Sequence, residues 1–216
     1  MSSGIGIRTS TRWLVRGIGL IVVLVLACSI LLYVVSAMGR SDSTEDQYAV
    51  WSAFLNSALL DGHDWGADGR CLVVLQGHTV RHFGDDGTLR DSVMAPLSLL
   101  FGKKPIAQLS SQTFRSFRIR NIWRESVTSS FRINGSYEVA TQKDIELFAK
   151  PEQSQRRFSG SCGYVELSAV GFNSAHSEAF FRADHFCGLC GGGGYVLMTK
   201  INGEWRVVKW DLFWVS

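Results

Sequence analysis

Hydrophobic residues in this chain form one long unbroken run near its start and shorter, periodic runs after it. Residues 17–38 carry no charged side chain, three arginines precede them, and mainly acidic side chains follow. A helix of this length spans about 33 Å at about 1.5 Å per residue, enough for a bilayer core of about 30 Å. Basic residues before the run place the N-terminus in the cytoplasm. The pattern predicts a cytoplasmic tail over 1–16, a transmembrane helix over 17–38 and an extracytoplasmic domain over 39–216.

Two other interpretations of the apolar run stay open. Val35 and Ala37 would suit a signal-peptidase site, although cleavable signals carry apolar cores of only about 7–15 residues. The stretch that ends at Cys28 loosely resembles a lipoprotein signal, but bulky Leu26 and the apolar residues after Cys28 argue against it. We therefore expect an uncleaved anchor that inserts into the lipid bilayer and places the domain outside the cell membrane.

Apolar residues at helical spacing predict three helices in the outer domain. The first covers residues 43–60, and the second covers residues 107–121 with a serine cap at its start. A third, short helix is predicted over 141–149, where Pro151 stops it. Most of the predicted helix therefore precedes the last third of the chain.

Strand signals concentrate at the C-terminal end. The apolar run Cys71–Leu75 predicts one buried strand and residues 131–139 a weaker one, whereas the patterns from Gly163 onward predict an all-β region. Asn202-Gly203 between two apolar runs predicts a β-hairpin, because both central turn residues need a positive φ. We therefore expect an α+β fold: the transmembrane helix, then one domain with helices first and a C-terminal antiparallel β-meander.

The net charge of +3 comes from the N-terminal tail and not from the outer domain. The chain has 22 basic and 19 acidic residues, and three of the basic ones precede the apolar run. The outer domain is therefore neutral, which argues against nucleic acid as a partner. One basic stretch remains, in which Arg115 and Arg118 alternate with aromatic residues. It predicts either a face for an anionic partner, such as lipid headgroups, or an ordinary surface helix with solvated arginines.

Four cysteines lie in the outer domain, and their even number in an oxidising compartment predicts disulfides. We expect one bond between Cys187 and Cys190 and a second between Cys71 and Cys162. In the chain-entropy model the long loop is worth about 4.5 kcal/mol and the short one about 2 kcal/mol. The longer bond would therefore contribute more to stability.

Two chemical alternatives use the same C-x-x-C spacing. Redox catalysis needs a thiolate of lowered pKa, usually at a helix N-terminus, whereas glycines and a predicted strand follow Cys190. A zinc site would add His185 to Cys187 and Cys190, with Cys71 or Cys162 as fourth ligand, but a structural zinc site usually pairs two C-x-x-C knuckles. We therefore expect no metal and no cofactor.

Other polar clusters in the sequence form no catalytic constellation. The aspartates in residues 61–68 lack the alternating spacing of a calcium loop. His78 and His82 are four residues apart in a predicted strand, and His176 and Glu178 lie across a predicted turn, where they can pair. The sequence contains no nucleophile elbow, zinc-binding helix motif, Walker loop or dinucleotide fingerprint. We therefore name no catalytic residue.

Four short motifs mark the C-terminal region. They are Val170-Gly171-Phe172-Asn173, Cys187-Gly188-Leu189-Cys190-Gly191-Gly192-Gly193, Lys200-Ile201-Asn202-Gly203-Glu204-Trp205 and Trp214-Val215-Ser216. Over about residues 160–216 they resemble an uncharacterised family of bacterial membrane-anchored or exported proteins that end in G-F-N…C-G-x-L-C-G-x-G…K-x-G-x-W…W-x-S. The resemblance implies an exported or membrane-anchored location and implies no activity.

Together these patterns predict a single-pass membrane protein whose outer domain binds an envelope protein partner and is not an enzyme. The alternative is a thiol-redox or metal-dependent enzyme that uses the loop of Cys187 and Cys190. Trp205, Trp210 and Trp214 are candidates for a partner surface, although the alternation along the strand assigns some of them to the core.

Overall fold

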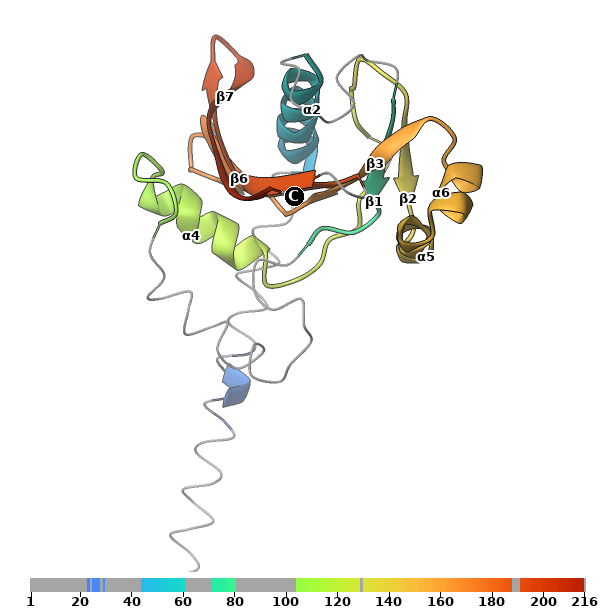
Figure 1. Ribbon diagram of the computed structural model, residues 1–216. Helices are drawn as coiled ribbons and strands as arrows, with labels where there is room; N and C mark the ends of the chain where they lie inside the picture. The colour runs from blue at the N-terminus through green and yellow to red at the C-terminus, as the bar shows by residue number, and fades with distance from the viewer. Residues whose placement is uncertain are drawn as a thin grey trace, which may run out of the picture. The chain divides into compact units, whose positions relative to one another are not determined.

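The computed structural model describes residues 44–60, 71–80, 104–128, 130–187 and 191–215, and five positions between 23 and 29 (Figure 1). Ser43–Ser216 forms one compact unit. Within the described ranges, no helix combines the length and the apolar character needed to cross a membrane. The transmembrane helix expected over 17–38 falls on a segment that lies almost entirely outside the described residues.

A sheet of seven strands organises the domain in the order β2-β1-β3-β5-β6-β7, with β4 paired to β5. The strands are β1 (Leu72–Gln76), β2 (Tyr137–Ala140), β3 (Ser161–Leu167), β4 (Gly171–Phe172), β5 (Glu178–Phe186), β6 (Gly191–Ile201) and β7 (Glu204–Val215). The helices are α2 (Thr44–Leu60), α4 (Ser111–Arg120), α5 (Gln142–Ile145), the short 3-10 helix η1 (Glu146–Ala149) and α6 (Pro151–Arg157). This order leaves β2 and β7 at the edges of the sheet.

The expected α+β organisation is wrong, because the sheet is mixed and helices alternate with its first strands along the chain. β1 pairs parallel with both β2 and β3, whereas β3, β5, β6 and β7 pair antiparallel. Parallel neighbours need a crossover, and helices lie in the chain between β1 and β2 and between β2 and β3. Val74 and Leu75 are 0% and 1% exposed, so the apolar run marks an inner strand covered on both faces. The fold is therefore mixed α/β.

Helix α2 lies over one face of the curved sheet and supplies large side chains to the core (Figure 1). Trp51, Phe54 and Leu55 are each 1% exposed. The Phe54 ring meets Phe181 of β5 edge-on at 5.3 Å and Trp210 of β7 at 5.5 Å between ring centroids. Helix α2 therefore joins an inner strand to the edge strand β7.

The opposite face of the sheet is covered by α4 and by the short helices around η1. Phe117 of α4 contacts Phe180 of β5, with ring centroids 4.8 Å apart. Phe180 and its neighbour Phe181 point to opposite faces, as alternation along a strand requires. Ser110 caps α4, because its side chain accepts a hydrogen bond from the Thr113 amide. The helix predicted over 107–121 is therefore present in shortened form.

Two local predictions have different outcomes. The hairpin is confirmed: Ile201 pairs with Glu204, and Asn202 and Gly203 have φ angles of 53° and 87°. Pro151, which we expected to stop a helix, instead lies in the first turn of α6. A proline is tolerated there because the first positions of a helix need no amide donor within the helix.

Candidate functional site

A glycine-rich strand lies at the centre of the C-terminal half of the sheet. The four residues Gly191–Gly194 begin β6 and pair with β5 on one side, and Gly192–Gly194 also pair with β7 on the other. A Cβ atom on Gly193 would stand 1.9 Å from Asp184 Oδ1 and 2.2 Å from Trp214 Nε1. Glycine at this position therefore leaves the space in which Asp184 and Trp214 meet across β6.

Asp184 is a fully buried carboxylate with 0% exposure. Its Oδ1 accepts a hydrogen bond of 2.8 Å from Trp214 Nε1. Arg182 donates through Nε to Oδ2 at 2.5 Å and through Nη2 to Oδ1 at 3.2 Å, and its guanidinium lies 5.1 Å from the centre of the Phe213 ring. Donors from β5 and β7 compensate the buried charge, so the cluster fastens the end of β7 to β5 across the glycines.

Two partly buried tyrosines belong to the same half of the sheet. Burial, with a smaller contribution from the carboxylates of Glu166 and Asp184, raises the pKa of Tyr164 to about 12. Burial also raises the pKa of Tyr195. Both hydroxyls stay protonated at neutral pH, so neither tyrosine supplies an activated nucleophile.

Exposed apolar side chains gather on the edge strand β7. Val208, Leu212, Phe213 and Val215 are 54%, 51%, 48% and 74% exposed, and Val207 is 36% exposed. Within the described ranges, β7 pairs with β6 alone. A long apolar edge strand presents unpaired backbone groups and side chains to any strand that can align with it. This strand is the candidate binding element of the domain.

The tryptophans that the sequence offered as a partner surface point mainly into the protein. Trp205 is 9% exposed and belongs to the core beneath α2. Trp210 packs against Phe54, and Trp214 donates to Asp184. The aromatic rings therefore hold β7 in place, and aliphatic side chains and Phe213 form its exposed surface.

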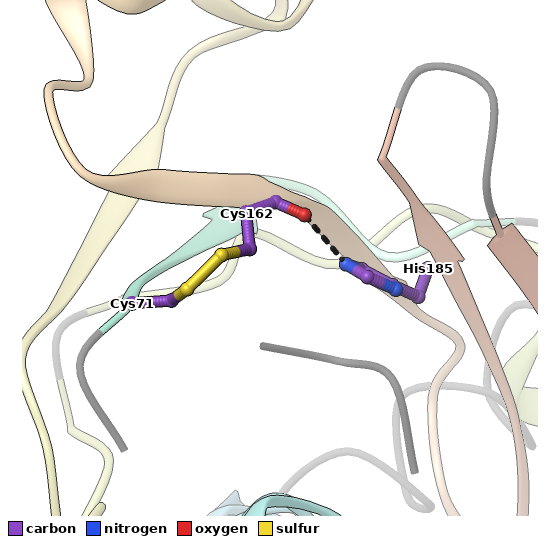
Figure 2. Close-up of a disulfide and its surroundings, with 3 residues drawn as sticks. All are labelled: Cys71, Cys162 and His185. Atoms are coloured by element: carbon purple, nitrogen blue, oxygen red, sulfur yellow. Dashed lines mark hydrogen bonds between the residues drawn. A yellow bond between two sulfur atoms is a disulfide. The ribbon is translucent and has the colours of Figure 1, made fainter. Parts of the chain in front are cut away.

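A disulfide joins Cys71, just before β1, to Cys162 in β3, 91 residues further along the chain (Figure 2). His185 of β5 lies beside it and donates from Nε2 to the Cys162 carbonyl oxygen at 3.1 Å. His185 is 4% exposed, and this burial lowers its pKa, although the hydrogen bond to Cys162 acts in the opposite direction. The expectation of a disulfide is confirmed, and the bond fastens two parallel strands to each other.

Cys187 is disulfide-bonded as well. Cys190, its predicted partner, lies outside the described residues. β5 ends at Phe186 and β6 begins at Gly191, so strands flank the C-x-x-C stretch on both sides. A thiol oxidoreductase usually has a helix in this place, where the helix N-terminus lowers the pKa of the thiol.

The two candidate residues for an anionic-partner face have different surroundings on α4. Arg115 is exposed, whereas Arg118 is 4% exposed and its guanidinium lies 5.3 Å from the centre of the Phe114 ring. Burial lowers the pKa of Arg118. Arg120 is buried too and pairs with Glu125 at 3.2 Å. The structure therefore does not bring Arg115 and Arg118 together on one solvated face.

The histidine pairs also differ from the expectation. His176 Nδ1 lies 2.7 Å from Asp46 Oδ2 of α2 and does not pair with Glu178, which accepts from the Ser110 amide at 3.1 Å. His82 and the aspartates of residues 61–68 lie outside the described residues. In the part of the chain that the structure describes, no three metal-binding side chains come together.

A pocket of about 460 Å³ opens between the start of α2 and residues 128–132. The Tyr48 hydroxyl on its wall already accepts from the Thr128 amide at 2.7 Å, and the Ser52 hydroxyl accepts from the Arg132 amide at 2.9 Å. These hydroxyls fasten α2 to the following segment, and the side chains of Thr44, Glu45 and Arg132 also line the pocket.

Comparison with protein-family models, with curated proteins and with solved structures finds no match for this chain. The resemblance of residues 160–216 to a bacterial exported family therefore stays a prediction. The function has to be argued from the geometry of the domain.

Sequence reasoning missed the residues that the structure makes most prominent. Arg182 and Asp184 lie two positions apart in β5, which places both on one face of the sheet. Opposite Asp184 stands Gly193, which belongs to a run of glycines that a strand would not normally contain. Those two signals together could have identified a cross-strand cluster only if the pairing register of β5 and β6 had been known.

Proposed function

We propose that this protein is a non-enzymatic interaction module outside the cytoplasm, held at the cell membrane by residues 17–38, and that β7 is its binding edge. The observation that supports the proposal best is the gathering of exposed apolar side chains on one edge strand. Exposed apolar patches on a folded domain mark interaction sites. An extended segment that adds to a sheet edge gains main-chain hydrogen bonds and side-chain contacts together.

The location outside the cytoplasm is supported by the disulfides. Cys71 and Cys162 are joined, and Cys187 is disulfide-bonded too. Such bonds persist in oxidising compartments and are rare in the cytosol. The uncharged run over residues 17–38, preceded by arginines, is a segment that could take the domain to that side of a membrane.

The buried polar groups of the domain also suit a binding module better than an enzyme. The Asp184 carboxylate is compensated by Arg182 and Trp214, and His185 is engaged with a backbone carbonyl. These groups hold strands together. The thiol-redox alternative requires reactive Cys187, and the strands on either side of it supply no helix dipole to activate a thiol.

Site-specific photocrosslinking tests the proposed binding edge. A photoreactive phenylalanine analogue replaces Val208 or Leu212 of the full chain in its native membrane, and Gln155 on exposed α6 serves as the control position. We expect protein adducts from positions 208 and 212 and none from position 155. Equal labelling at all three positions, or no adduct at β7, would contradict the assignment of β7 as the binding edge.

A further inference from the structure

We infer that the partner of the β7 edge is a second copy of this chain, joined by antiparallel pairing of the two β7 strands. This inference deepens the proposed function and rests on it. Two features of β7 carry it: the face of the sheet on which each residue lies, and the order of the charges along the strand.

The pairing of β7 with β6 has two bulges, one at Val208 and one at Phe213, and the bulge at Val208 lies near the middle of the strand. Leu197 of β6 pairs with Lys209, and the next residue, Met198, pairs with Val207, so Val208 is the extra residue. Such an insertion shifts the alternation of side chains by one position. Odd-numbered residues face α2 before the bulge, and even-numbered residues face it from Trp210 to Leu212.

The contacts of the tryptophans confirm this shift. Trp205 lies in the core beneath α2, and Val207 pairs with Met198 of that core. After the bulge, Trp210 contacts Phe54 of α2, and Leu212 follows two positions later on the same face.

The charged residues of β7 lie on the other face of the sheet. Arg206 stands opposite Thr199 of β6, and Asp211 stands opposite Tyr195. Tyr195 packs against the core on the α4 side, so this face is the one turned away from α2. Arg206 and Asp211 are five positions apart and would face opposite sides in a regular strand. They share a face because the bulge at Val208 shifts the alternation by one position.

The pattern of faces is symmetric about the bond between Val208 and Lys209. A two-fold axis perpendicular to the sheet, passing between the two β7 strands at the level of that bond, pairs residues 204–207 with residues 210–213 of the second copy, each with one of the same face. Three of the resulting cross-strand pairs are Arg206 with Asp211, Val207 with Trp210, and Trp205 with Leu212, and each occurs twice in the dimer. Two ion pairs and four apolar pairs would thus form across the new ladder.

Charge selects this register over the neighbouring one. Moving the axis one residue toward the hairpin turn would place Glu204 opposite Asp211 and Arg206 opposite Lys209. Those pairs bring like charges together and oppose association. In the register with the axis between Val208 and Lys209, no two like charges stand directly opposite each other. Self-complementary charge is the reason to choose a second copy over an unrelated extended peptide.

The exposure of β7 agrees with such a partner. Arg206 is 61% exposed at its side chain and pairs with Glu204 of its own strand at 3.3 Å, so it is accessible to a second carboxylate. Val208 and Leu212, at 54% and 51%, would both lose solvent contact in the joined sheet. Removal of apolar surface from water provides the main driving force for association.

The test reverses the charges of one predicted pair in the full chain in detergent. Arg206→Asp places two carboxylates opposite each other at both symmetry-related contacts, and Asp211→Arg places two guanidinium groups there. Both contacts become repulsive in each homodimer. Sedimentation equilibrium at matched solvent density measures the dissociation constant of the dimer. We expect each single variant to dimerise at least about tenfold more weakly than the native chain.

A mixture of the two variants provides the sharper measurement. When R206D meets D211R, one contact pairs the two introduced side chains and the other pairs the two native ones with each other. The first contact is attractive and so is the second, so the mixture should form a heterodimer about as tightly as the native chain forms its homodimer. The double variant R206D/D211R should likewise recover dimerisation. Arg115→Asp, at an exposed position of α4 that is distant in the sequence from β7, is the matched control and should leave the dissociation constant unchanged.

Three results would overturn the inference: a native chain that stays monomeric, a dimer that single charge reversals do not weaken, or a mixture that does not recover. Each is distinguishable from failure of the proposed function. A monomeric chain whose positions 208 and 212 still crosslink to another protein would keep β7 as a binding edge and remove only the second copy as its partner. Absence of any adduct at β7 would remove both.

Discussion

At the scale of single residues, Gly193 is the position at which the fold tolerates least change. A Cβ there would overlap Asp184 Oδ1 at 1.9 Å and Trp214 Nε1 at 2.2 Å, so one of these groups must leave the hydrogen bond. We expect Gly193→Ala to lower the free energy of unfolding by about 1–3 kcal/mol, as overpacking does. Urea denaturation measures the change. Gly192→Ala is the control, since its nearest atom would be the Trp214 carbonyl oxygen at 3.4 Å, and equal losses in both variants would contradict the explanation.

His185 predicts how stability depends on pH. Burial lowers the pKa of this histidine in the folded chain, so between the folded and unfolded pKa values the unfolded chain binds more protons. The contribution of neutral His185 to the free energy of unfolding is fully present above the unfolded pKa of about 6.5. It falls as the pH drops below that value, by up to about 1.4 kcal/mol per pH unit. Denaturation at a series of pH values should show this loss, and His185→Gln should reduce it. An unchanged slope in the variant would assign the dependence to other groups.

At the scale of elements, the sequence predicted those whose signals are local. The first helix, the Ser110 cap and the Asn202-Gly203 hairpin each depend on residues within one or two turns of one another, and all three are present. The arrangement of β1 between β2 and β3 depends on pairing with residues more than sixty positions away. No pattern within a short window reports such pairing, which is why the mixed sheet and the cluster around Asp184 escaped the sequence analysis.

The bond between Cys71 and Cys162 should contribute strongly to stability, because it joins strands that the chain separates widely. It closes a loop of 91 residues, for which the chain-entropy model gives about 4.5 kcal/mol. We expect Cys71→Ser with Cys162→Ser to lower the free energy of unfolding by about 2–5 kcal/mol. Urea denaturation without reductant measures it. Adding reductant to the double variant then isolates the bond of Cys187, and a larger loss in that second step would reverse the expected order.

At the scale of the whole molecule, the domain combines a packed interior with one exposed apolar edge strand. Two ion pairs involve buried charged side chains, Asp184 with Arg182 and Arg120 with Glu125. The other edge strand, β2, has four residues against twelve in β7, so the two edges differ in how much they can bind. A long exposed edge is an aggregation risk for an isolated domain. A dimer through β7 would remove that risk and use the edge for assembly.

The location of the domain is the prediction that belongs to the molecule as a whole. The proposed location outside the cytoplasm predicts that a membrane-permeant alkylating reagent leaves Cys71 and Cys162 unmodified in intact cells, because their disulfide would persist in an oxidising compartment. A chain that lacks residues 1–42 would stay in the cytoplasm, where thiols are kept reduced, and should be alkylated at both positions. Peptide mass analysis counts the modified cysteines. Rapid alkylation of both cysteines in the full chain would place the domain in a reducing compartment and remove the main support for an exported module. Full protection in both chains would show instead that the disulfide forms without export, and the role of residues 17–38 would then need to be sought in anchoring alone.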